Sequence, residues 1–307
     1  MRPGDIPLYN DIRAKLQTYK AIRPLPGIDN PQNEECFVLQ LIDSVRRVKY
    51  VRLISESVDS PITANPLNAA FDPIKAAAWH HSQGNINEAF WLVFLSTHFG
   101  KNLNTKWNLV RDVYSGLTDN IVWNWENVCA DRDGFLAWLN ANQDTLRARG
   151  KVGNHRKYQS LDAYNANGTG SAINSYIDWI GENHNHQELI DNALDASEND
   201  PKRAFRHLYN SMNAVKSFGR MARFDYLTMI GKLNLINIVP DSTYMTGATG
   251  PVTGARILFG QNVNSTTFEE WFTELDEHLG LEFGMQILED AVCNWQKNTA
   301  NYIHFKG

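Results

Sequence analysis

The sequence predicts an all-α protein with many helices. Apolar residues recur at helical spacing along most of the chain, whereas the alternating apolar and polar positions of half-buried strands are scarce. Proline follows Asp72, Asp200 and Gly250, which puts it at the first position of three helices, where its missing N–H costs nothing. Residues 50–54 form the best strand pattern, and they are too few to imply a sheet.

The individual helices follow from apolar spacing, from these start signals and from closing glycines. The first begins at Pro31 and is long and amphipathic, because apolar side chains follow Phe37 at i+4, i+8 and i+11. Gly84 and Gly100 close the next two. These rules place helices at residues 31–52, 73–83, 87–98, 104–116, 131–147, 170–181, 185–197, 201–215, 219–234, 251–259, 266–279 and 282–299.

Three stretches rich in Gly, Pro, Asn and Ser interrupt the helices, at residues 55–71, 147–169 and 235–250. The middle stretch suggests two helical lobes, 1–150 and 151–307, although one continuous domain is also compatible with the pattern. No internal repeat or low-complexity tract is present.

Composition favours a globular protein of the cytoplasm. Of the 307 residues, 43% are hydrophobic and 21% are charged, which is typical of a folded chain. No apolar run reaches 18 residues, so no membrane span is expected, and the N-terminus lacks the apolar core of a signal peptide. Cys36, Cys129 and Cys293 are odd in number and far apart, which argues against a disulfide framework or a zinc finger.

The charge distribution is uneven. The net charge is −5, but residues 147–160 hold five Lys or Arg and no acid, and residues 202–232 hold seven cations and one acid, Asp225. A mildly acidic chain with two cationic segments suits a local site for a polyanion better than a non-specific nucleic-acid coat. The alternative is that the two cationic segments are ordinary solvent-exposed surfaces and form no binding site.

The helix expected at 216–234 carries the most informative charges. Lys216, Arg220 and Arg223 fall at i, i+4 and i+7, and Gly219 leaves backbone N–H groups near the helix start for an anion. Arginine offers a planar fork that suits phosphate oxygens. Asp225 is flanked by apolar residues, so it either pairs with an arginine or acts as a base.

Three other segments are candidates for weaker reasons. The glycine-rich turn at 247–256 lacks the ending of a P-loop and resembles the hairpin of helix-hairpin-helix modules, although an ordinary turn fits equally. The loop at 153–158 combines cations with an aromatic ring, which suits a nucleic-acid backbone or plain solvation. In the last helix, Glu289 flanks the apolar face and Asp290 points away from it.

No metal or cofactor is expected. His80 and His81 are adjacent, so their side chains would point in different directions on a helix and could not bind one metal ion together. His184 and His186 lack the surrounding sequence pattern of a nuclease. The metal-ligand spacing HExxH is absent, as are GxSxG, GxGxxG and the deaminase signature.

Several stretches together resemble a known family. They are residues 88–101, 156–158, 217–227, 247–259 and 288–293. In order and spacing they are similar to the alpha-glutamyl/putrescinyl thymine pyrophosphorylase family, third clade, over residues 30 to 300. The resemblance implies a helical fold related to helix-hairpin-helix DNA glycosylases. It also implies action on bacteriophage DNA, in which a transferase displaces pyrophosphate from pyrophosphorylated 5-hydroxymethyluracil with an amine, either an amino acid or a polyamine such as putrescine.

The resemblance also implies roles for the candidate residues. It implies that the protein acts in the cytoplasm of a host cell infected by a bacteriophage. Guanidinium groups would stabilise the departing pyrophosphate, a carboxylate would take a proton from the amine, and aromatic rings would stack on a base flipped out of the duplex. The phosphate contacts are Arg220 and Arg223 first, then Lys216, Arg156, Lys157 and Arg256. The proton acceptor is Asp225, with Glu289 and Asp290 in reserve. The stacking residues are Tyr158, Tyr226 or His155, the turn with Gly250 and Gly254 would hold the DNA backbone, and His98 is either a site residue or a core histidine.

One feature departs from the glycosylase-like relatives, because no lysine nucleophile can be placed. Two alternatives therefore stay open beside the transferase. One is a glycosylase or lyase on the same fold, and the other is a helical DNA-binding protein without catalysis.

Overall fold

The computed structural model describes residues 2–57, 60–117 and 121–304. The regular secondary structure in these ranges is helical, and the only β pairings among these residues are two isolated bridges, Asn102 with Lys106 and Ser160 with Gly168. The all-α prediction is therefore confirmed. None of the helices in these ranges combines the length and apolarity that a membrane crossing requires.

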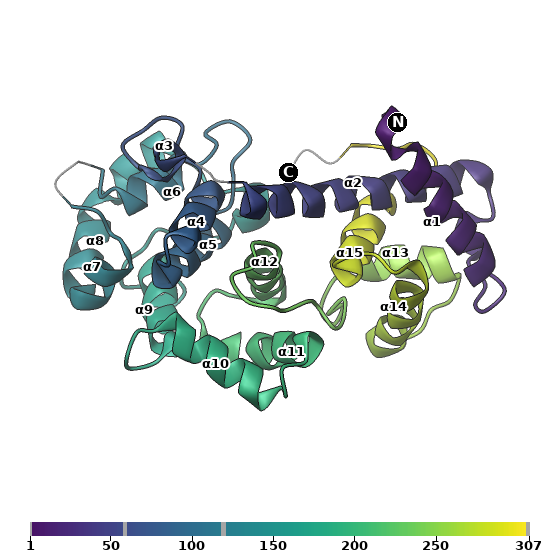
Figure 1. Ribbon diagram of the computed structural model, residues 1–307. Helices are drawn as coiled ribbons and strands as arrows, with labels where there is room; N and C mark the ends of the chain where they lie inside the picture. Colours follow the sequence, from purple (N-terminus) through teal and green to yellow (C-terminus); the bar gives the residue numbers. More distant parts are fainter. Residues whose placement is uncertain (1, 58–59, 118–120, 305–307) are drawn as a thin grey trace. The chain divides into compact units, whose positions relative to one another are not determined.

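The chain divides into two compact units (Figure 1). One comprises the chain up to Tyr50 together with the residues from Val239 onward, and the other is Val51–Ile238. The boundary near Tyr50 falls inside one helix, α2 (Pro31–Glu56). The lobe boundary suggested by the sequence, near residue 150, lies within the second unit.

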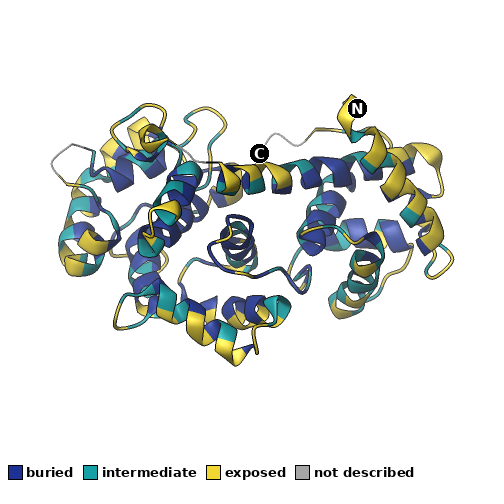
Figure 2. Cartoon of the chain, viewed as in Figure 1, coloured by how far each residue is buried: buried dark blue, intermediate teal, exposed yellow. Residues whose placement is uncertain are grey.

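The first unit is built from helices near both ends of the chain. In order they are η1 (Pro3–Asp5), α1 (Ile6–Tyr19), η2 (Pro26–Ile28), the first part of α2, α13 (Gly250–Phe259), α14 (Ser265–Leu279) and α15 (Gly284–Trp295). Ile12, Leu16 and Tyr19 put the buried side of α1 onto this core, while its outer side is exposed (Figure 2). Aromatic residues of α13 and α14 and Trp295 complete the core.

The second unit contains the remaining helices. In order they are α3 (Pro61–Ala64), α4 (Pro73–Ser82), α5 (Ile86–Phe99), α6 (Asn108–Tyr114), α7 (Trp125–Ala130), α8 (Arg132–Arg149), η3 (Asn154–Arg156), α9 (Thr169–Ile180), α10 (His186–Ala196), α11 (Pro201–Ser211), η4 (Met212–Ala214) and α12 (Arg220–Lys232). Side chains cap several starts: Asp72 accepts from Ile74 N–H at 3.0 Å, and Asp200 accepts from Arg203 N–H at 2.7 Å.

Helix α5 is the core of the second unit. Every residue from Glu88 to Phe99 is buried, and the helix packs against α4, α6, α7, α10 and α12. A helix that is apolar all round must be covered on all sides, which explains why these five helices pack around it. The few polar side chains that α5 carries are therefore held in the protein interior.

Candidate functional site

Arg156 and Asp225 form an ion pair beside the end of α5. The Arg156 side chain is only 7% exposed; its Nε donates to the Thr97 carbonyl at 2.7 Å and its Nη2 to Asp225 Oδ2 at 2.8 Å. Asp225, on α12, is 43% exposed. The predicted pairing of Asp225 with an arginine is therefore present, but its partner comes from the loop before α9 and not from its own helix.

Two glycines let this loop approach α5 closely. Gly153 N–H donates to the Phe99 carbonyl at 2.8 Å, and a Cβ on Gly153 would lie 3.0 Å from the carbonyl carbon of Gly100. Gly100 itself has φ of +70°, a conformation that favours glycine. The backbone is thus packed tightly enough to deliver the Arg156 side chain into the interior.

His98 is wholly buried next to Arg156. Its Nε2 lies 3.0 Å from Thr169 Oγ1, and its ring is parallel to those of Phe94 and Phe218. Burial, and then the Arg156 charge, lower the pKa of His98 to about 3. The imidazole is therefore neutral and sits in the core, which agrees with the core alternative.

Tyr226 belongs to a buried chain of polar groups. Its hydroxyl lies 2.9 Å from that of Tyr176, which lies 2.8 Å from His186 Nε2. His186 Nδ1 in turn lies 2.9 Å from Asn87 Oδ1. Burial lowers the pKa of His186 to about 3. The Tyr226 ring is thus enclosed rather than presented to a base, and the chain of hydrogen bonds links α12 to the start of α5.

The three cations near α12 do not share one helical stripe. The helix begins at Arg220, so Lys216 lies in the segment before it, and the expected alignment holds only for Arg220 and Arg223. Arg223 stacks over the Tyr209 ring at 4.3 Å, and its Nη1 donates to the Tyr209 carbonyl at 3.1 Å and to Asn213. Arg223 therefore ties α12 to α11. The backbone N–H of exposed Lys216 donates to Ser175 Oγ.

The cationic segment at 147–160 forms a pocket of about 550 Å³. Arg147, Lys151 and Lys157 line it together with polar groups of Asn102 and Ser160, and no carboxylate is among its lining residues. Arg147 also pairs with Asp144, which is fully exposed. The arrangement suits a phosphate or pyrophosphate group, because cations and neutral donors surround the space.

An exposed aromatic ring stands next to this pocket. The Tyr158 ring is 89% exposed, and Lys157 Nζ lies 5.0 Å from its centroid. An aromatic face that water covers in the free protein is available for a base to stack on.

The glycine-rich turn has a packing reason for its glycines. A Cβ on Gly254 would lie 2.3 Å from the Val292 carbonyl of α15, and one on Gly250 would lie 3.0 Å from Cys293 Sγ. These two positions face α15, whereas Arg256 is exposed on α13. The turn and Arg256 belong to the first unit, and the residues described above belong to the second.

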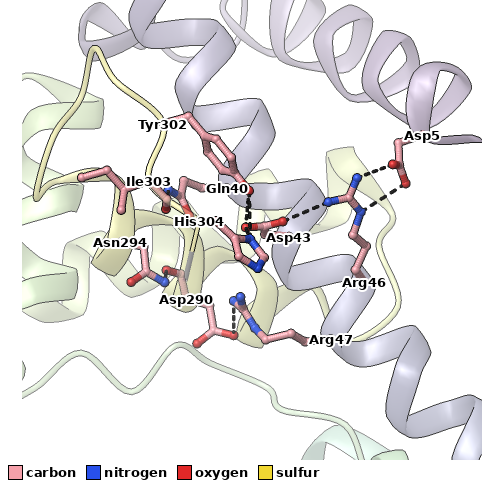
Figure 3. Close-up of polar contacts among 10 residues, drawn as sticks. All are labelled: Asp5, Gln40, Asp43, Arg46, Arg47, Asp290, Asn294, Tyr302, Ile303 and His304. Carbon is pink, nitrogen blue, oxygen red and sulfur yellow. Dashed lines mark hydrogen bonds and ion pairs between the residues drawn. The ribbon is translucent and has the colours of Figure 1, made fainter. Parts of the chain in front are cut away.

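The reserve carboxylates also belong to the first unit. Glu289 is buried. Asp290 accepts a hydrogen bond from Arg47 Nη2 at 3.2 Å (Figure 3) and another from Ser44 Oγ at 2.9 Å. Asp290 thus ties α15 to α2.

Asp43 is a buried carboxylate that the sequence did not reveal. It accepts hydrogen bonds from Tyr302 and from Arg46 Nη1 at 3.1 Å, and it lies 2.7 Å from His304 Nδ1 (Figure 3). Arg46 extends the cluster to Asp5. These contacts tie the last described residues to α2.

A second pocket was also missed, at the start of α5. Its volume is about 610 Å³, and Asn87, Glu88, Trp125, Glu126 and His184 are among its lining residues. The signal that could have found it is Glu88 itself, an acid within an otherwise apolar stretch. Among the described residues, no three His, Cys, Asp or Glu side chains gather as metal ligands would.

Comparison with known proteins gives the family. A family model described as "Alpha-glutamyl/putrescinyl thymine pyrophosphorylase clade 3" matches residues 32–307. No curated protein and no solved structure matched the chain. The matched range includes every candidate residue named in this section except Asp5. The chain therefore belongs to the alpha-glutamyl/putrescinyl thymine pyrophosphorylase family, clade 3, an enzyme family of thymine hypermodification in DNA.

Proposed function

We propose that this enzyme is a transferase that replaces the pyrophosphate of pyrophosphorylated 5-hydroxymethyluracil in DNA with an amine. The amine nitrogen would attack the methylene carbon on C5 of the base and form a C–N bond. The C–O bond to pyrophosphate would break, and pyrophosphate would leave with the electron pair. The proton lost by the amine would go to a carboxylate.

The observation that carries this proposal is the cationic pocket, seen in a chain of this family. Arg147, Lys151 and Lys157 surround a space of about 550 Å³ without a lining carboxylate, in a protein whose net charge is −5. A local concentration of cations on an acidic protein favours a specific polyanion site. We assign this pocket to phosphate groups of the DNA substrate, with Arg220 and Lys216 as further contacts.

Asp225 is the proposed proton acceptor, although it pairs with Arg156. Only its Oδ2 accepts from Arg156, and the side chain is 43% exposed and lies in the same unit as the cationic pocket, so we propose that the carboxylate acts as the base while the ion pair holds it in place. Glu289 is buried, and Asp290 is engaged by Arg47 and Ser44, so both are weaker candidates. Tyr158 is the proposed stacking residue, because its ring is exposed whereas that of Tyr226 is enclosed. Arg256 and the turn at 247–254 would add backbone contacts.

Binding to a labelled oligonucleotide that carries the pyrophosphorylated base tests the pocket. We expect Lys151→Gln and Lys157→Gln each to weaken binding several-fold, because each removes a cation that faces the phosphates. Lys49→Gln, at an exposed position of the first unit, is the control and should bind as the wild type does. Equal affinity of all four proteins would refute the assignment of the pocket.

A further inference from the structure

A short hairpin between α5 and α6 presents an exposed leucine. Asn102 and Lys106 pair across it through backbone hydrogen bonds of 2.9 and 3.1 Å. Asn102 Oδ1 accepts from the N–H groups of Asn104 and Thr105 at 2.9 and 3.1 Å. Lys106 Nζ donates to the Leu103 carbonyl at 2.6 Å. These bonds fix the backbone of the tip, whereas Leu103 itself is 54% exposed.

The hairpin is attached to the cationic pocket of the second unit. Asn102 is a lining residue of that pocket, and its Nδ2 donates at 2.9 Å to the carbonyl of Val152, which also lines the pocket. The N–H of Lys151, a third lining residue, donates to Thr105 Oγ1 at 3.1 Å. Leu103 therefore directly follows a residue of the pocket wall and is held there by the wall itself.

Position distinguishes Leu103 from other exposed apolar side chains, which are ordinary on a protein surface when they are scattered. In the described part of the second unit, the large apolar side chains that are exposed are Leu53, Ile62, Leu67, Leu103, Ile121, Tyr158, Tyr164 and Met221. Among these, Leu103 and Tyr158 are the two that directly neighbour lining residues of the cationic pocket. One pocket thus has an exposed aromatic ring and an exposed aliphatic side chain next to its wall.

The charges of the hairpin suit DNA. Lys101 and Lys106 are exposed on either side of the tip in the sequence, and residues 100–107 contain no acid. The Lys101 Nζ lies 5.3 Å from the centroid of the Trp107 ring. Lysines attract the phosphates of the DNA backbone. An apolar side chain between two such lysines can then reach the stacked bases, as the apolar wedges of other DNA-binding proteins do.

We propose that Leu103 enters the DNA duplex at the position that the modified base leaves, while the base turns toward Tyr158. A base must leave the stack before an enzyme can act on it, and the gap that it leaves exposes the faces of the neighbouring bases to water. An apolar side chain that fills this gap keeps water out and blocks the return of the base. The inference rests on the proposed function in taking a modified base in DNA as the substrate.

The fluorescence of 2-aminopurine tests the insertion without any transfer chemistry. The probe is a duplex in which 2-aminopurine lies directly next to pyrophosphorylated 5-hydroxymethyluracil, and no amine is added. This fluorescence rises when a neighbouring base leaves the stack. With the DNA saturated by protein, we expect Leu103→Ala to give about a third of the wild-type rise or less, because the base returns to an unfilled gap. Leu103→Met should restore the rise, because methionine can also act as a wedge.

Leu67→Ala is the matched control for this experiment. Leu67 is 59% exposed in the same unit, and residues 60–72 contain no lysine or arginine that would bring them to the phosphates. This variant should give the wild-type rise. A wild-type protein that saturates the DNA without any rise, or a Leu103→Ala variant with the full rise, would overturn the proposal.

Transfer to duplex and to single-stranded DNA separates insertion from a general defect. A base in a single strand needs little or no extrusion, so the wedge is dispensable there. We expect Leu103→Ala to lower the initial rate of transfer to the duplex about tenfold and to leave the rate on the single strand unchanged. An equal loss on both substrates would mean that Leu103 supports the fold or the pocket, and would also overturn the proposal.

The two experiments keep this inference apart from the proposed function. If the fluorescence rise depends on Leu103 but no amine is ever transferred to DNA, the insertion stands and the proposed function fails. If transfer occurs and Leu103→Ala acts on the duplex as fast as the wild type does, the proposed function stands and the insertion fails.

Discussion

At the scale of single residues, the buried polar groups around α5 are the feature that separates this chain from an ordinary helical core. Arg156, His98 and Glu88 all lie on or against this helix and are at most 8% exposed. An arginine in such surroundings is stabilised only if its donors are satisfied. Arg156 meets this condition through the Thr97 carbonyl and Asp225.

Replacing Arg156 should therefore destabilise the protein. We expect Arg156→Leu to lower the free energy of unfolding by about 1–3 kcal/mol, because the buried Thr97 carbonyl loses its charged donor. Urea denaturation of this variant and of Lys157→Leu, the exposed neighbour, provides the comparison. The control should lie within about 0.5 kcal/mol of the wild type. A loss of the same size in both variants would show that the contacts of Arg156 do not account for the lost free energy of unfolding.

The buried histidines predict a pH dependence of stability. In the unfolded chain they titrate near 6.5, but in the fold the pKa values of His98 and His186 are about 3. Below pH 6.5 these two imidazoles therefore bind protons in the unfolded state but stay neutral in the folded state. Each histidine should cost about 1.4 kcal/mol of stability per pH unit, from about pH 6.5 down to 3.

Denaturant unfolding at pH 7.5 and 5.5 checks this pH dependence. His98→Phe should reduce the loss on acidification by about 1.4 kcal/mol, because phenylalanine can stack on Phe94 and Phe218 without titrating. His207→Gln, at an exposed position, should lose as much stability as the wild type. A His98→Phe variant with the wild-type pH dependence would mean that His98 already titrates normally in the fold.

At the scale of elements, local patterns predicted most helices, but not their ends or their partners. The starts at Pro31, Pro73 and Pro201 are confirmed, since a proline at the first helical position is a purely local signal. The helix expected at 104–116 covers only Asn108–Tyr114. Among the described residues, three α-helices were missed. Helices α3 and α7 have four and six residues, which is too few for a period to show, and α1 was not predicted although Ile12, Leu16 and Tyr19 are spaced for a helix.

Candidate residues could be named from local composition, but their contacts could not. The cationic segment was visible in the sequence, and it does line a pocket. The partner of Asp225 is 69 residues away, and no local rule connects the two positions. The pocket at Glu88 was missed because it joins segments about 100 residues apart, from Asn85 to His184. The implied relation to helix-hairpin-helix glycosylases stays a prediction.

Gly254 gives an element-scale prediction about how α13 packs on α15. Alanine there would place a Cβ 2.3 Å from the Val292 carbonyl, so the two helices would have to move apart. We expect Gly254→Ala to cost about 1–3 kcal/mol of stability. Gly219→Ala is the control, because nothing lies within 4 Å of the Cβ that alanine would add there, and the φ of Gly219 is negative. Thermal unfolding that showed no difference between the variants would contradict the tight packing.

At the scale of the whole molecule, the charge balance constrains how DNA can be held. The net charge of −5 disfavours a broad coat of phosphate contacts, whereas the three cations of the second unit's pocket are concentrated. If this pocket supplies most of the phosphate contacts, the logarithm of the DNA-binding constant should fall with the logarithm of salt with a slope of about −2 to −3. Fluorescence anisotropy between about 50 and 200 mM salt gives the slope, and Lys157→Gln should make it shallower by about one. A much steeper slope would require many more cations than the pocket holds.

The most direct test of the account is the transfer reaction itself. The protein is incubated with DNA that carries pyrophosphorylated 5-hydroxymethyluracil and with putrescine, and the DNA is then digested to nucleosides for mass spectrometry. The account predicts a thymidine nucleoside that bears the amine through a C–N bond, together with released pyrophosphate. A digest without such an adduct for putrescine or any other amine, or with free base released and abasic sites left in the DNA, would contradict it.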